Sequence, residues 1–263
     1  MESLKKILEK FEENRKDTLE KKEEWDRKNI DEKYKAIAEW FKPCAEDILC
    51  NGYFLVNGKY IIDLGAIELY YHEEEGEIKD YIMYHIKDKI KSKIKNFENE
   101  LPYFKFGSFN LHQSGVDVTF ENIEKKYRAS FLIRSYRVLK TEDGLYPEND
   151  NTQYDPCSTH IFDDMFYSGY GDTEIVWIPT DRKGGNIELC PRVHVAEYRK
   201  DKEGNYIKDN KGNYEKEDII VSDSDYKAEY EDAKNAKRTP MYFKTGSKTY
   251  KQDMREWQFR LKK

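Results

Sequence analysis

The chain has 263 residues, of which 38% are hydrophobic and 37% charged, and its formal net charge is −6. This length suffices for one large domain or two small ones with a sizeable core. No apolar run approaches the roughly 18 residues of a membrane span, and the start MESLKKILEK lacks a signal peptide's apolar segment. We therefore expect a cytoplasmic protein with no membrane partner. The 4 cysteines form no CxxC pair, which predicts free thiols and no metal site, and we expect no cofactor.

The N-terminal region is predicted to be helical and charged. Residues 2–28 are rich in Lys and Glu, with a few apolar residues at helical spacing near the start, as in a solvated helix with a short apolar stripe. A second helix is expected from Asp31 to Phe41, because Pro43 follows and should end it. We predict a helical extension over residues 1–43.

From residue 53 onward the apolar pattern is that of strands. The run YFLVNGKYIIDLGAIELYY places an Asn-Gly turn between two apolar segments, which is a strong hairpin signal. GSFNLHQSGVDVTFEN and YRASFLIRSYRVL each read as one further strand. Residues 201–233 read as an inserted polar hairpin followed by an acidic, partly helical stretch. The prediction is a single α+β domain, residues 44–263, around a curved antiparallel sheet with flanking helices.

Glu68 interrupts the apolar run IELYY. The simplest interpretation places it on the solvent-facing side of a strand. A buried carboxylate beside aromatic rings is instead typical of a general base, because burial raises its pKa toward neutrality. The sequence alone leaves both interpretations open.

The segment HQSGVD contains three residue types that can form a nucleophilic triad. If it is one continuous strand, His112 and Ser114 share a face while Asp117 points to the other. A Ser-His-Asp triad is therefore not expected here. His112 can be either a pocket residue or a structural histidine.

Positive charge concentrates toward the C-terminus. Residues 234–263 hold ten Lys or Arg against two acidic residues, and lysines alternate over residues 87–95. An acidic chain that segregates charge in this way can still present a basic face to phosphates. The candidate phosphate contacts are Lys244, Lys248, Lys251 and Arg255. Lysine-rich surfaces also serve solubility, and this alternative stays open.

The order of the motifs resembles the alkyladenine (3-methyladenine) DNA glycosylase family. The segments that carry the resemblance are AEDILCNGYFLVNGKY, AIELYY, GSFNLHQSGVDV, ASFLIRSYRV, CPRVHV and EWQFRL. The resemblance covers about residues 44–263. It implies a single mixed domain around a curved antiparallel sheet, and a base-excising N-glycosylase that acts on modified or damaged bases in nucleic acid, with duplex DNA as the expected partner.

The same resemblance assigns roles to individual residues. Glu68 matches the family's catalytic glutamate, which activates water, and Tyr70 matches the tyrosine that stacks on the flipped base. His112 lies near the second stacking aromatic residue, Arg134 matches the arginine that holds the site and the DNA backbone, and His85 is a candidate for the family's site histidine. These residue types suit the chemistry, because a flipped base needs aromatic faces and a positioned base or water.

Three positions depart from the family's pattern. Ser114 precedes Gly115 where the family has an intercalating tyrosine, Glu121 replaces the asparagine that screens purines, and His194 replaces a glycine. Two alternatives therefore stay open. One is a non-catalytic nucleic-acid or nucleotide-binding module on the same fold. The other is a hydrolase of N-glycosidic bonds in small molecules, which the overall acidity favours.

Overall fold

The structure is a computed structural model and describes residues 2–83, 101–112, 115–147, 151–156, 160–166, 173–181, 183–203, 205–210, 214–236 and 238–262. The chain divides into two compact units, one formed by residues 1–79, 103–189 and 257–263 and the other by residues 80–102 and 190–256. The predicted insertion, residues 201–233, lies within the second unit. Among the described helices, none combines the length and apolar character that a membrane crossing requires.

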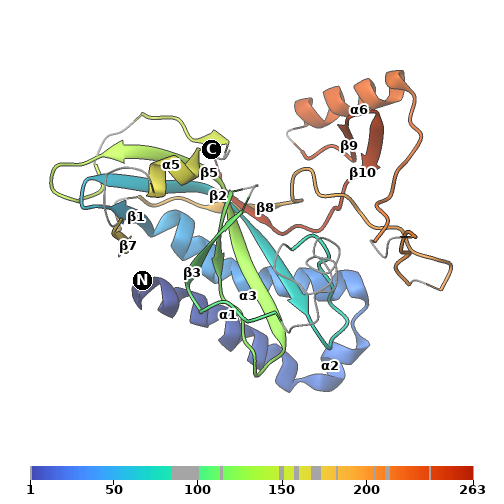
Figure 1. Cartoon of the computed structure of the whole chain (residues 1–263), viewed down its shortest axis with the longest axis horizontal. Helices are drawn as coiled ribbons and strands as arrows, with labels where there is room; N and C mark the ends of the chain where they lie inside the picture. The colour runs from blue at the N-terminus through green and yellow to red at the C-terminus, as the bar shows by residue number, and fades with distance from the viewer. Residues whose placement is uncertain are drawn as a thin grey trace. The chain divides into compact units, whose positions relative to one another are not determined.

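The first unit is built on an antiparallel sheet that curls into a half-barrel (Figure 1). Its main path runs in the order β3-β4-β5-β2-β1-β7; β6 pairs with β5, β11 with β2, and β8 with β11. The strands are β1 Gly52–Val56, β2 Tyr60–Glu73, β3 Ser108–His112, β4 Gly115–Thr119, β5 Tyr127–Lys140, β6 Asp155–Pro156, β7 Ile175–Pro179, β8 Ile187–Cys190 and β11 Gln258–Leu261. The predicted α+β class with a curved antiparallel sheet is confirmed.

The β1–β2 connection confirms the hairpin predicted from Asn-Gly. Val56 pairs with Tyr60 across the turn, and Asn57 and Gly58 have φ values of 51° and 67°. Positive φ at both positions is what a tight turn between twisted strands requires, and Asn-Gly adopts it most easily. The turn sets the register of β2, the strand that carries Glu68.

Helices cover one face of this sheet (Figure 1). They are α1 Glu2–Glu20, α2 Lys22–Arg27 and α3 Ile30–Cys50. The expectation of a solvated N-terminal helix is wrong, because Leu4, Leu8 and Phe11 of α1 are all 0% exposed and belong to the main core. The Phe11 ring lies 5.1 Å from that of Phe120. A short apolar stripe is therefore enough to place α1 in the core when its residues are large.

Pro43 does not end α3, contrary to the prediction. Proline removes one helical hydrogen bond and crowds the preceding turn, at a cost of about 3 kcal/mol. Phe41 and Ile48 lie on either side of it, and both are fully buried in the same core. Burying a side chain of this size contributes about 1.5–3 kcal/mol. Packing of the continuous helix thus offsets the local penalty.

The second unit contains helix α6 and a small hairpin. Helix α6 spans Asp223–Asn235 and is capped by Ser222, whose side chain accepts a hydrogen bond from the Asp225 amide. Strands β9, Tyr242–Thr245, and β10, Lys248–Lys251, pair with each other. The helix overlaps the end of the stretch that was predicted to be partly helical and runs two residues beyond it.

Candidate active site on the polar face of the sheet

Along the long strand β2, one face of the sheet is apolar and the other is polar. Ile67, Leu69 and Tyr71 join the core beneath the helices. Side chains alternate along a strand, so Glu68 and Tyr70 lie on the opposite face. This polar face holds the residues that the sequence singled out.

A β-bulge brings a second carboxylate, Asp63, onto the same face. Five positions separate Asp63 from Glu68, which in a regular strand would place them on opposite faces. The pairing with β5 shifts register between Leu64 and Ile67, and both of those residues nevertheless pack in the core. The extra residue therefore reverses the alternation. Gly65 fits this position because a Cβ there would lie 2.6 Å from the Tyr154 ring.

Glu68 is fully buried and is held by donors from three strands. Its Oε1 accepts from the Gln258 amide of β11 at 3.0 Å and lies 3.2 Å from the Arg134 Nε of β5. Its Oε2 accepts from the Tyr70 hydroxyl at 3.0 Å. The side-chain exposure is 0% for Glu68 and 24% for Arg134. The contact between the guanidinium and the carboxylate is of the charge-assisted kind.

The structure thus brings together three of the residues predicted from the sequence, Glu68, Tyr70 and Arg134. The solvent-facing interpretation of Glu68 is wrong, because burial on the polar face replaces water with fixed donors. Sequence reasoning missed Gln258, which is the direct cross-strand partner of Glu68. A polar residue between Trp257 and Phe259, both fully buried, was the available signal.

His112 and Asp117 meet on the same polar face, so the prediction that they lie on opposite faces of one strand is wrong. Residues 107–122 do not form one strand: His112 ends β3, Gly115 begins β4, and the two residues pair antiparallel. Chain reversal places His112 Nε2 3.1 Å from Asp117 Oδ2, with side-chain exposures of 9% and 5%. Ser114 lies outside the described residues, as do His85 and the lysines of residues 87–95.

The four candidate phosphate contacts lie in the second unit, and each forms an ion pair. Lys244 lies 2.7 Å from Asp223, Lys248 3.4 Å from Asp218, and Lys251 2.7 Å from Glu197. Arg255 pairs with Asp253 and lies 3.4 Å from Asp80. Much of the local positive charge is thereby compensated by carboxylates of the same unit.

Two of the positions that the resemblance singled out, Glu121 and His194, have a defined structural setting. Glu121 lies 3.1 Å from the buried Arg128 and accepts from the Phe104 amide at 2.8 Å, so it holds together the edge of the sheet. His194 has a φ of 60°, a left-handed conformation that glycine adopts most easily. The backbone shape that favours glycine is therefore present here with a different side chain.

A second buried cluster surrounds Asp63. Its Oδ2 accepts from Arg137 Nε at 2.8 Å and from the hydroxyls of Tyr146 and Tyr154 at 2.7 and 2.5 Å. Its Oδ1 pairs with Lys183. Burial lowers the pKa of Lys183, while the charge of Asp63 opposes this effect. The sequence carried the same signal as for Glu68, a carboxylate within the apolar run YIIDL, and it was missed.

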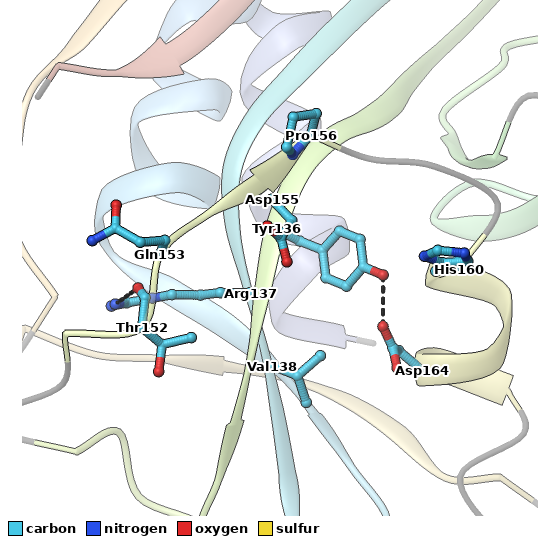
Figure 2. A pocket seen from close by; sticks show the side chains of 9 residues that line it. All are labelled: Tyr136, Arg137, Val138, Thr152, Gln153, Asp155, Pro156, His160 and Asp164. Carbon is cyan, nitrogen blue, oxygen red and sulfur yellow. Dashed lines mark hydrogen bonds between the residues drawn. The ribbon is translucent and has the colours of Figure 1, made fainter.

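A cavity of about 630 Å³ lies beside Arg137, between β5, β6 and helix α5, Ile161–Phe166. The Tyr136 hydroxyl donates to Asp164 at 2.6 Å on one side of it, and Arg137 donates to the Thr152 carbonyl on the other (Figure 2). Its described lining contains none of the residues predicted from the sequence. Within the described part of the chain, no group of three or more His, Cys, Asp or Glu residues is placed to hold a metal ion.

Comparisons with protein-family models, with curated proteins and with solved structures find no match to this chain.

Proposed function

We propose that this protein hydrolyses N-glycosidic bonds of modified or damaged bases in nucleic acid, with Glu68 as the group that activates water. The observation that carries the proposal is the convergence of Glu68, Tyr70 and Arg134 on one buried polar face. A buried charged network is often no more stable than well-packed apolar residues of the same volume. Retaining one in the middle of an apolar strand therefore points to chemistry.

The proposed step uses one water molecule and no redox partner. Glu68 accepts a proton from water while the oxygen attacks the anomeric carbon, and the glycosidic electron pair leaves with the base. Arg134 and Gln258 fix the carboxylate from one oxygen. The Tyr70 hydroxyl fixes it from the other, and the ring offers an aromatic surface for the base.

Access to Glu68 requires local opening of the polar face, because its side chain is 0% exposed. Arg134, with 24% of its side chain exposed, and the half-buried Tyr70 link the carboxylate to solvent. Movement of covering groups before reaction is common in enzymes that exclude water.

The test uses duplex and single-stranded oligonucleotides carrying a panel of modified bases, followed by cleavage at abasic sites. Wild type is expected to give strand scission on part of the panel. Glu68→Gln, which keeps the volume but removes the charge, should lower the rate by 10²-fold or more, in the range of general-base effects. Leu111→Ala is the matched control, because Leu111 is 47% exposed on the neighbouring part of the sheet. Equal scission by wild type and Glu68→Gln would refute the role of Glu68.

A second candidate is the same hydrolysis on a small N-glycoside. It is favoured by the ion pairs of Lys244, Lys248, Lys251 and Arg255, which leave less charge for phosphates. A nucleoside screen that detects free base separates it from the first proposal. Salt-dependent oligonucleotide binding without any product would instead identify a non-catalytic binding module.

A further inference from the structure

The cavity between β5, β6 and α5 has side chains of opposite charge in its lining. Arg137 lies on one side of it, and Asp164 of α5 lies on the other (Figure 2). Its volume of about 630 Å³ falls in the range of roughly 300–1,000 Å³ that is typical of small-molecule sites. Its described lining belongs to the first unit and does not include Glu68. The cavity is therefore a candidate binding site separate from the proposed active site.

Two carboxylates in the lining are held near opposite ends of one tyrosine side chain. Asp155 pairs directly with Tyr136 between β6 and β5, and directly paired residues lie on the same face of a sheet. At the other end, the Tyr136 hydroxyl donates to Asp164 Oδ2 at 2.6 Å. Within the described part of the chain, neither carboxylate forms an ion pair. Both negative charges therefore border the cavity without a cationic partner from the described residues.

The positive charge in the lining is fixed in place. Arg137 Nε donates to Asp63 at 2.8 Å, one terminal nitrogen donates to the Tyr146 hydroxyl at 2.6 Å, and the other donates to the Thr152 carbonyl at 2.9 Å. The Arg137 side chain is nevertheless 12% exposed. A guanidinium presents five N–H donors in one plane and can bond several acceptors at once. Because this one is already oriented, a ligand carboxylate pays little entropy to order it.

We propose that this cavity binds a small ligand that carries both an ammonium group and a carboxylate, which is the chemistry of a free amino acid. Arg137 receives the ligand's carboxylate, and Asp155 and Asp164 receive its ammonium group, so that both ends form charge-assisted hydrogen bonds. A ligand with only one of these charges gains one attraction and is repelled by the other part of the lining. This inference goes beyond the proposed function and does not depend on it.

Calorimetric titration of the full chain tests the proposal. The probes are the common L-amino acids, γ-aminobutyrate and ε-aminocaproate, which differ in the separation of their two charges. Butyrate and butylamine are the singly charged analogues of γ-aminobutyrate. At least one dipolar probe is expected to bind about 10-fold or more tightly than either analogue, since a hydrogen bond to a charged group contributes about this factor.

Variants locate the site within the chain. Asp164→Asn and Asp155→Asn should each weaken binding of the best dipolar probe by about 10-fold or more. Asp155 is exposed, so Asp155→Asn is the decisive variant if Asp164→Asn lowers the melting temperature. Glu142→Gln is the matched control, because it removes one negative charge at an exposed position outside the described lining of the cavity. It should leave the affinity unchanged.

Three results would overturn the proposal. They are no binding of any dipolar probe at millimolar concentrations, binding of butylamine as tight as that of the best dipolar probe, and equal losses in Asp155→Asn and Glu142→Gln. The second result would indicate a site for amines alone. Because none of these measurements uses oligonucleotides or Glu68, their failure is distinguishable from failure of the proposed hydrolysis.

Discussion

Substitution of Asp63 tests the structure directly, because its carboxylate is the counter-charge of two buried cations. The side-chain exposures of Asp63, Lys183 and Arg137 are 0%, 2% and 12%. Asp63→Asn keeps the shape of the side chain but leaves both cations without their counter-charge. Removing one partner of a buried ion pair costs about 3–5 kcal/mol, because an uncompensated charge remains in the interior. We expect a decrease of this size in the free energy of unfolding of the first unit.

Tryptophan fluorescence can follow that unit selectively during urea denaturation. The chain has 4 tryptophans, and all of them, Trp25, Trp40, Trp177 and Trp257, lie in the first unit. The matched control is Glu188→Gln, which breaks a carboxylate–arginine pair with Arg260 on the same sheet, where the side chains are 37% and 39% exposed. Such exposed pairs contribute at most about 1 kcal/mol. If Asp63→Asn lowers stability no more than Glu188→Gln does, the buried cluster does not exist as described.

Three further predictions concern burial. Phe11→Ala should lower the free energy of unfolding of the first unit by about 3–5 kcal/mol. The control is Glu9→Ala, at an exposed position of the same helix, which should change this free energy by less than about 0.5 kcal/mol. Equal urea midpoints for the two variants would show that α1 is not in the core. Burial, together with the charge of Asp63, raises the pKa of Tyr146 from 10.0 to about 12, so the folded state keeps a proton that the unfolded state releases. Its contribution to stability is complete below pH 10 and lost as the pH rises toward 12, and Tyr146→Phe should flatten this part of the pH profile of urea midpoints. Burial raises the pKa of the Cys44 thiol to about 12, so Cys44 should resist alkylation at pH 8 in the folded protein and react after denaturation, as mass spectrometry of peptides can show.

Local signals in the sequence predicted strands and turns, but not the features that depend on long-range packing. Asn57 and Gly58 specify a turn by their own backbone preferences, and the hairpin formed as expected. Pro43 is an equally strong local signal in the opposite direction, and it failed because the residues on both sides of it bury in one core. Local conformational propensity sets the end of a helix only where tertiary packing does not favour a different end.

The candidate site shows the same division. Glu68 was detectable as a carboxylate inside an apolar run, since such a residue needs a specific environment. Its contact with Gln258 depends on the pairing of β2 with β11, 190 positions apart in sequence, and no periodicity encodes that pairing. The meeting of His112 with Asp117 depends on a chain reversal between them, whereas the alternating pattern predicted one continuous strand.

The two buried carboxylates of β2, Asp63 and Glu68, differ in their surroundings, and this difference argues for distinct roles. Asp63 is enclosed by Lys183, Arg137 and two tyrosine hydroxyls, which tie β5 and three positions outside the strands to β2. Glu68 pairs with Arg134, whose side chain is 24% exposed to solvent. A charge held for chemistry needs fixed donors on one side and a route for substrate on the other. The catalytic proposal rests on Glu68, because Arg134 is more exposed than Arg137, the arginine that pairs with Asp63; the stability prediction rests on Asp63.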